Sequence, residues 1–193
     1  MSRYFPLALE VDGRPCVVLG NGAEAIRRAS ALLEAGALVS LVAESPSAEL
    51  RELAAQRGLT LTERRPRGSD LDGHWLAVFS ERDPALATEL GAAANERRIW
   101  FCAVDDPRAS SYAHMAQARA GLVTVSISTS GKAPALGRRL SEELRRVFDS
   151  AGLAAFAQKL AELRERTPSA ERGRVLGEAV AGVELEGRLR LPE

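Results

Sequence analysis

The sequence predicts an α/β protein whose first part is a doubly wound parallel sheet. Three observations support this prediction. Short runs that are apolar throughout recur over roughly the first 110 residues, and these are typical of strands buried on both faces. Helical segments separate most of the runs. The order strand–helix–strand favours parallel pairing with right-handed crossovers.

The first strand is expected over 15–20 and the first helix over 21–36, with Gly36 as the helix stop. Apolar residues of this helix recur at helical spacing: Ala25, Ala29, Leu32 and Leu33. The other elements are expected, in chain order, at 37–44 (strand), 47–58 (helix), 59–64 (strand), 75–80 (strand), 83–98 (helix, with an Asp-Pro start) and 99–104 (strand).

A different organisation follows. One more strand is expected over 122–129. From Pro134 the composition changes, and three amphipathic helices rich in i,i+4 charge pairs are expected over 134–148, 153–167 and 168–183.

Composition narrows the class of protein. The 193 residues are 46% apolar and 27% charged, which is typical of a folded chain, and 26 basic residues balance 26 acidic ones, which argues against a protein that coats nucleic acid. Cys16 and Cys102 are expected to be buried free thiols, and the two histidines exclude a His-rich metal cage. No apolar stretch approaches the roughly 18 residues of a membrane span, and the N-terminus does not resemble a signal peptide, so a cytoplasmic protein is expected.

The segment "GNGAEA", Gly20 to Ala25, matches the pattern G-x-G-x-x-G/A between a strand and a helix. Gly20 permits the tight turn, Gly22 lets a pyrophosphate approach the backbone, and Ala25 allows close helix–strand packing. The helix start offers N–H groups and a positive dipole end to phosphates, so Asn21, Ala23 and Glu24 join the expected cofactor-binding residues.

Glu44 lies at the end of the second expected strand, at the position where an acid binds the ribose hydroxyls of NAD. No basic residue beside it favours a 2′-phosphate, so NAD is expected rather than NADP. The alternative for the whole motif is a tight turn without a ligand.

Three blocks of the chain resemble one family. The blocks are "PLALEVDGRPCVVLGNGAEAIRRASALLEAGALVSLVAES", "DLDGHWLAVFSERDPALATELGAAANERRIWFCAVDDPRASSY" and "GLVTVSISTSGKAPALGRRLSEEL". They are similar to the precorrin-2 dehydrogenase/sirohydrochlorin ferrochelatase family, the N-terminal module of siroheme synthases. The similarity runs from Tyr4 to about Leu144.

The resemblance implies a Rossmann-type NAD-binding domain over 1–113, a dimerisation segment over 114–147 and a C-terminal helical domain over 148–193. It implies oxidation of precorrin-2 to sirohydrochlorin with NAD, in a homodimer, and many members also insert ferrous iron to give siroheme. In the segment "FSERD", Ser80 is expected to complete the cofactor site.

The two acids of "DDP", Asp105 and Asp106, are expected to have different roles. The resemblance implies that Asp105 is the catalytic acid, which accepts a proton during dehydrogenation and assists chelation. At the carboxyl end of a strand, such a carboxylate is well placed to act as a base. Asp106 and Pro107 are expected only to shape the turn, which is also the alternative for the pair.

"STSGKAP", Ser128 to Pro134, is the second candidate site, because small residues before a helix suit an anionic ligand. A tetrapyrrole with several carboxylates needs a basic wall. The expected substrate-binding residues are Thr129, Ser130, Gly131, Lys132, Arg138 and His114. The alternative for the basic residues is a solvated helix face.

The chain also departs from the family pattern. Cys102 replaces the usual asparagine, and His114 and Met115 occupy the wall beyond the acids. His114 is either a proton carrier or a structural residue. Asn21 replaces a usual glycine, a mild change because asparagine tolerates the left-handed conformation.

Two other functions therefore stay open. One is a non-catalytic paralogue that binds a tetrapyrrole or metal, and the other is an NAD(H)-responsive dimeric regulator. The sequence shows no helix-turn-helix or basic recognition stripe that would support nucleic-acid binding.

Overall fold

The structure is a computed structural model and describes residues 4–186 and 189–191. The chain forms two compact units that divide between His114 and Met115. The predicted boundary between 147 and 148 lies within a helix of the second unit, and the dimerisation role of 114–147 stays a prediction.

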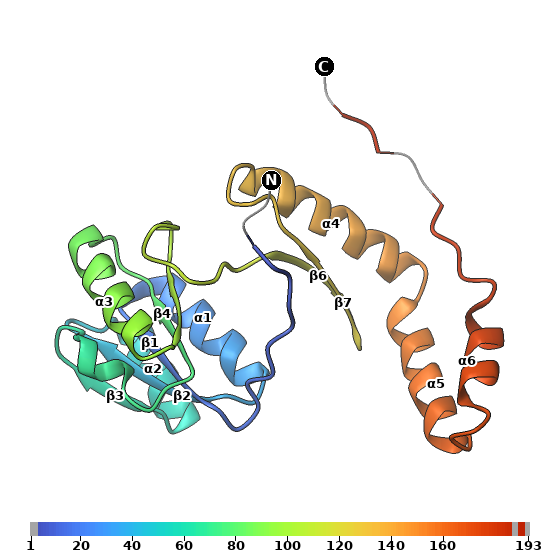
Figure 1. The fold of residues 1–193 in the computed structure, drawn as a ribbon, viewed down its shortest axis with the longest axis horizontal. Helices are drawn as coiled ribbons and strands as arrows, with labels where there is room; N and C mark the ends of the chain where they lie inside the picture. The colour runs from blue at the N-terminus through green and yellow to red at the C-terminus, as the bar shows by residue number, and fades with distance from the viewer. Residues whose placement is uncertain (1–3, 187–188, 192–193) are drawn as a thin grey trace. The chain divides into compact units, whose positions relative to one another are not determined.

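The first unit contains a five-stranded parallel sheet in the order β3-β2-β1-β4-β5 (Figure 1). The strands are β1 (Pro15–Leu19), β2 (Leu38–Ala43), β3 (Thr60–Glu63), β4 (Leu76–Phe79) and β5 (Trp100–Ala103). Chain order reverses between β1 and β4, which makes the sheet doubly wound and confirms the predicted fold class.

Helices cover both faces of this sheet. α1 (Gly22–Glu34) and α2 (Ala48–Arg57) pack on one face, and α3 (Pro84–Glu96) and a short 3-10 helix η1 (Gly68–Leu71) pack on the other. β1 serves both layers, because Val18 joins the α1 side while Val17 and Leu19 join the α3 side. This two-sided burial explains why the central strands β1 and β4 are apolar throughout.

Local caps define the helix ends. Asp83 accepts a hydrogen bond from the Leu86 N–H at 3.0 Å, and Pro84 follows it at the first helical position of α3, as the Asp-Pro start predicted. Ser47 caps α2 in the same way, and Gly58 ends α2 in the left-handed conformation.

Serine side chains cover the free edge of β5. The Ser110 hydroxyl accepts from the Ala103 N–H at 3.0 Å, and the Ser111 hydroxyl accepts from the Phe101 N–H at 2.9 Å. The Ser111 N–H donates in turn to the Phe101 carbonyl at 2.8 Å. The segment after the paired acids therefore satisfies backbone groups that an edge strand would leave open.

The second unit is a hairpin followed by three helices. β6 (Ala116–Ala120) pairs antiparallel with β7 (Val123–Ile127), and α4 (Pro134–Ser150), α5 (Leu153–Arg166) and α6 (Arg172–Val180) follow. β7 and the three helices were predicted, whereas β6 was missed because alanine has low β-propensity. Its alternation was visible: Ala118 and Ala120 are buried, and Gln117 and Arg119 are exposed.

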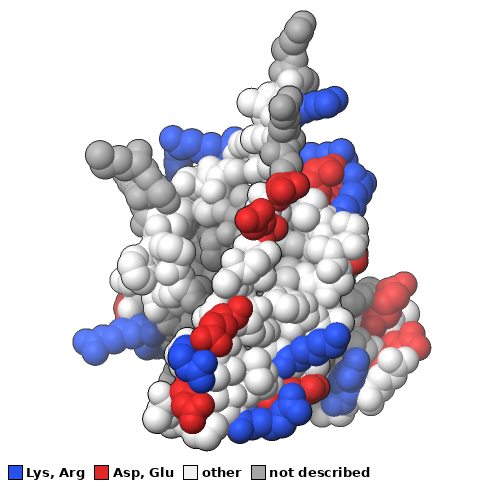
Figure 2. All heavy atoms as spheres, turned by 90° about the vertical axis from the view of Figure 1, so that its right-hand side faces the viewer, with Lys and Arg blue, Asp and Glu red and all other residues white. Residues whose placement is uncertain are grey.

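Among the described residues, no helix is long and apolar enough to cross a membrane. On the face seen in Figure 2, basic and acidic side chains are interspersed and form no continuous basic stripe.

The contact between α3 and the loop after β5 yields a stability prediction. A Cβ on Gly91 would lie 2.5 Å from the Ala109 carbonyl oxygen, so Gly91→Ala must push the loop and helix apart. We expect the free energy of unfolding to fall by about 1–3 kcal/mol, despite the better helix propensity of alanine.

The matched control is Gly177→Ala in α6, where a Cβ would meet nothing within 4 Å. This variant should keep the wild-type stability or gain up to about 1 kcal/mol. Urea unfolding of both variants checks the pair, and equal stabilities would contradict the close α3–loop contact.

Candidate cofactor and substrate site

Parallel pairing brings the candidate cofactor residues to one edge of the sheet. Leu19 is in register with Val42 and Phe79, and Phe79 is in register with Ala103. The segments that leave these strands carry Gly20, Glu44, Ser80 and Asp105. This edge includes the switch point between β1 and β4, where open α/β sheets bind ligands.

The two glycines of the turn have different surroundings. Gly20 has φ 114°, and a Cβ there would lie 2.6 Å from the Ser80 Oγ and 2.7 Å from the Glu81 Cγ. Gly22 has φ 77°, and a Cβ there would meet nothing within 4 Å. Gly20 thus allows close packing against the segment after β4, whereas Gly22 borders open space at the start of α1.

The start of α1 offers donors to that open space. The first N–H groups of a helix have no intrahelical acceptor, so those of Ala23 and Glu24 suit a pyrophosphate. Ala25 is fully buried and allows the close helix–strand packing that the motif predicts. This geometry fits a dinucleotide.

Asn21 corrects one expectation from the sequence. Its backbone is extended, with φ −138° and ψ 176°, so its tolerance of the left-handed conformation is not used. Its side-chain oxygen accepts from the Gly22 N–H at 2.7 Å and from the Ser47 N–H at 2.9 Å, and its Nδ2 donates to the Ser45 carbonyl at 2.6 Å. Asn21 therefore joins the turn to the β2–α2 loop.

An acidic side chain, Glu81, lies near Glu44, the residue expected to bind the ribose, and near Asp83. Glu44 is exposed directly after β2. The pKa of Glu81 is raised by its partial burial and by the nearby carboxylates Glu44 and Asp83, while Arg65 opposes the shift. Arg65 itself forms an ion pair with Asp83 at 2.9 Å. This edge can accept hydrogen bonds from hydroxyl groups.

Glu24 and Ser80 use their side chains within the protein. The Glu24 carboxylate accepts from Arg27 at 2.6 Å and from Arg28 at 2.8 Å. Partial burial raises the pKa of Glu24, but the two arginines outweigh it and lower the pKa overall. The Ser80 hydroxyl donates to the Leu19 carbonyl at 3.3 Å. Glu24 can therefore contribute its backbone N–H to a phosphate while its carboxylate stays paired.

The paired acids after β5 have different geometries. The Asp106 Oδ1 accepts from the Arg108 N–H at 3.0 Å and, more weakly, from the Ala109 N–H at 3.4 Å, which confirms its predicted turn role. Asp105 is exposed and has φ 63°, the left-handed conformation that costs non-glycine residues energy. A strained, exposed carboxylate at a sheet edge is a feature found at functional sites.

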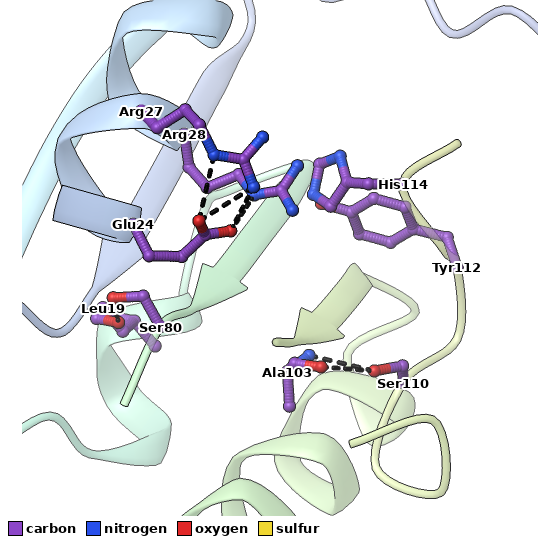
Figure 3. A network of polar contacts seen from close by, with 9 residues as sticks. All are labelled: Leu19, Glu24, Arg27, Arg28, Ser80, Ala103, Ser110, Tyr112 and His114. Carbon is purple, nitrogen blue, oxygen red and sulfur yellow. Dashed lines mark hydrogen bonds and ion pairs between the residues drawn. The ribbon is translucent and has the colours of Figure 1, made fainter. Parts of the chain in front are cut away.

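A second polar group lies on the α1 side of the sheet (Figure 3). The Tyr112 hydroxyl lies 3.3 Å from the His114 Nε2, and the two rings meet edge to face at 5.1 Å. Figure 3 shows Arg28 reaching from α1 toward these rings, and only 14% of its side chain is exposed.

Beside Arg28, the side chains of Cys102, Tyr112 and His114 are favoured in their uncharged forms. Burial raises the pKa of the Cys102 thiol and of the Tyr112 hydroxyl. Loss of water around the ring, together with Arg28 and Arg27, lowers the pKa of His114, although the residue as a whole is exposed. His114 and Cys102 were singled out from the sequence, whereas Arg28 and Tyr112 were not. The i,i+4 spacing of Glu24 and Arg28 was the available signal.

The predicted substrate residues after β7 belong to the second unit. The Thr129 hydroxyl accepts from the Ala133 N–H at 3.3 Å, and Gly131 has φ 73°. Lys132 and Arg138 are exposed. Residues 129–132 form a short polar connection into α4, and Arg138 lies within α4. This arrangement is compatible with an anionic ligand.

Within the described residues, no group of three His, Cys, Asp or Glu side chains could hold a metal ion.

The fold and the turn define the class of protein as a dinucleotide-binding α/β protein. Residues 7–116 match a family model described as "Putative NAD(P)-binding". This match covers more than half of the chain, so the chain belongs to this NAD(P)-binding family.

The chain is also similar to siroheme synthases. It is 32% identical over 188 residues to siroheme synthase 3 of Aeromonas hydrophila, covering 96% of this chain and 40% of that protein. It is 36% identical over 162 residues to the siroheme synthase of Gluconacetobacter diazotrophicus, covering 81% and 34% respectively. The chain thus spans less than half the length of these relatives.

Among solved structures, the chain resembles that of SirC, a precorrin-2 dehydrogenase. The TM-score is 0.76 at 24% identity, covering 92% of this chain and 89% of SirC. This likeness supports the fold.

The contrast between the two turn glycines is testable. Gly22→Ala places a methyl group in the open space beside the start of α1, so the affinity for NAD⁺ should fall at least about tenfold, while stability falls only about 1 kcal/mol from the positive φ. Gly20→Ala should lose about 1–3 kcal/mol of stability, because its Cβ collides with Ser80 and Glu81.

Calorimetric titration with NAD⁺ and thermal unfolding of both variants measure these effects. Wild-type NAD⁺ affinity in Gly22→Ala would show that the open space does not receive the cofactor.

Proposed function

We propose that this protein oxidises precorrin-2 to sirohydrochlorin with NAD⁺ in siroheme biosynthesis. The observation that supports this most directly is the sheet edge, where an open glycine turn, Glu44 and the strained Asp105 follow neighbouring parallel strands. Similarity to siroheme synthases over most of the chain, and to the fold of a precorrin-2 dehydrogenase, supports the choice of substrate.

The residues of the first unit would hold NAD⁺ as follows. The N–H groups of Ala23 and Glu24 bind the pyrophosphate, and Glu44 accepts hydrogen bonds from the ribose hydroxyls. The neighbouring Glu81 and Asp83 make a 2′-phosphate unfavourable, which favours NAD over NADP. When bound, the cofactor supplies the hydride acceptor.

Asp105 takes the proton. Dehydrogenation removes a hydride and a proton from the substrate, and an exposed carboxylate at the sheet edge can accept the proton. The Asp106 turn and the Ser110 bonds to β5 hold Asp105 in its left-handed conformation. The turn therefore presents one acid to the substrate and keeps the other within the protein.

Cationic groups would bind the carboxylates of the tetrapyrrole. Lys132 and Arg138 carry the charge, while Thr129, Ser130 and Gly131 provide polar contacts. His114 is proposed separately as a substrate contact. We propose that the protein is a homodimer, with residues 114–147 forming the subunit contact.

A second activity, insertion of Fe²⁺ into sirohydrochlorin, is proposed because the relatives are siroheme synthases. Iron is then a substrate. Asp105 would accept the pyrrole protons that the metal displaces, so one carboxylate would serve both reactions.

Asp105→Asn tests the proposal. Asparagine adopts the left-handed backbone at no greater cost than aspartate but is a poor base, so turnover of precorrin-2 with NAD⁺ should fall at least about 100-fold while NAD⁺ affinity stays unchanged. NADH formation and the sirohydrochlorin spectrum, followed anaerobically with and without Fe²⁺, are the readouts.

Asp106→Asn is the matched control. It keeps the Oδ1 acceptor for Arg108 and Ala109, so it should retain turnover. If the wild-type protein forms no NADH, the proposed reaction is refuted. If Asp105→Asn keeps full activity, Asp105 is not the base.

A further inference from the structure

Asn21 connects two segments that serve different parts of a dinucleotide. The glycine turn binds phosphate, and the β2–α2 loop carries Glu44 for the ribose. The three hydrogen bonds of the Asn21 carboxamide, at 2.6, 2.7 and 2.9 Å, use its oxygen twice and its nitrogen once. One side chain therefore joins the two segments, in addition to the backbone bond from the Gly20 N–H to the Val42 carbonyl at 2.8 Å.

The loop is also held from its other side. The Ser47 hydroxyl caps α2 by accepting from the Leu50 N–H at 3.2 Å, and Arg51 donates to the Pro46 carbonyl at 2.7 Å. These bonds join the loop to α2 alone. Among the side-chain hydrogen bonds described for 45–47, those of Asn21 join the loop to the glycine turn.

We infer that Asn21 is a specificity-determining residue, which sets the preference for NAD over NADP by fixing Glu44 relative to the phosphate-binding turn. The inference rests on the proposed use of a dinucleotide. The Ser45 carbonyl that Asn21 binds belongs to the residue next to Glu44, so this bond restrains the backbone that carries the carboxylate. Discrimination needs that restraint, because a Glu44 free to turn away no longer repels a 2′-phosphate.

The substitutions have distinct physical effects. Asn21→Ala removes all three hydrogen bonds. Asn21→Asp keeps the acceptor for Gly22 and Ser47 but loses the donor to the Ser45 carbonyl, and it places two oxygens against each other. Both should loosen the loop that carries Glu44.

The test is a double-mutant cycle between Asn21 and Glu44. Calorimetric Kd values for NAD⁺ and NADP⁺ are measured for the wild type, Asn21→Ala, Glu44→Ala and the double variant. We expect Asn21→Ala to lower the Kd ratio of NADP⁺ to NAD⁺ about 5–10-fold, equivalent to the loss of one hydrogen bond. In the Glu44→Ala background, Asn21→Ala should leave the ratio unchanged.

Ser47→Ala is the matched control. It removes the cap of α2 but keeps the Ser47 N–H bond to Asn21, so its melting temperature should fall while the Kd ratio stays that of the wild type. Comparison of Ser47→Ala with Asn21→Ala therefore separates a general loss of loop stability from loss of the Asn21 hydrogen bonds.

The failures can be told apart. Suppose that the wild type prefers NAD⁺. If Asn21→Ala then keeps the full preference, or lowers it equally in the wild-type and Glu44→Ala backgrounds, the role of Asn21 is refuted. The proposed dehydrogenase activity is unaffected by that result. If the wild type binds NAD⁺ and NADP⁺ equally, the selection by Asn21 is likewise refuted. If it binds neither, the proposed function fails together with the inference.

Discussion

The parallel register of β1 with its two neighbours is the constraint on which the site depends. Pairing Leu19 with both Val42 and Phe79 brings the ends of three strands to the same level. The buried core on both faces maintains this register, because a shift by one residue would exchange the side chains of the two faces. The positions of Gly20, Glu44 and Ser80 at one edge are therefore a consequence of core packing.

Around this edge, the short polar connections determine what each residue can do. Asp106 is tied into its own turn, and Ser110 occupies the edge of β5, so Asp105 is left exposed in a strained conformation. At the glycine turn, Asn21 takes one N–H of α1, and helix geometry leaves the next ones to a ligand. In both places, one residue makes hydrogen bonds within the protein, and the groups of its neighbour are left available to a ligand or substrate.

The sequence predicted much of the fold, because buried strands and capped helices have local signals. The apolar run of β1, the Asp83-Pro84 start of α3 and the glycine pattern at 20–25 were readable directly. β6 was missed because alanine has low β-propensity, and the alternation of alanine with polar residues is a weak signal over five residues. The bond from Asn21 to Ser45 and the approach of Arg28 to Tyr112 join residues far apart in the chain, so they required the structure. The substrate residues Lys132 and Arg138 remain predictions.

The central claim is that a dinucleotide binds across the glycine turn and the end of β2. The most direct measurement is a titration of isotopically labelled protein with NAD⁺, followed by amide NMR. The account predicts that the largest shifts occur at Gly22, Ala23 and Glu24 and over 44–47, with small shifts at the opposite, amino-terminal edge of the sheet near Trp75. Shifts confined to other segments, or none at saturating NAD⁺, would contradict it.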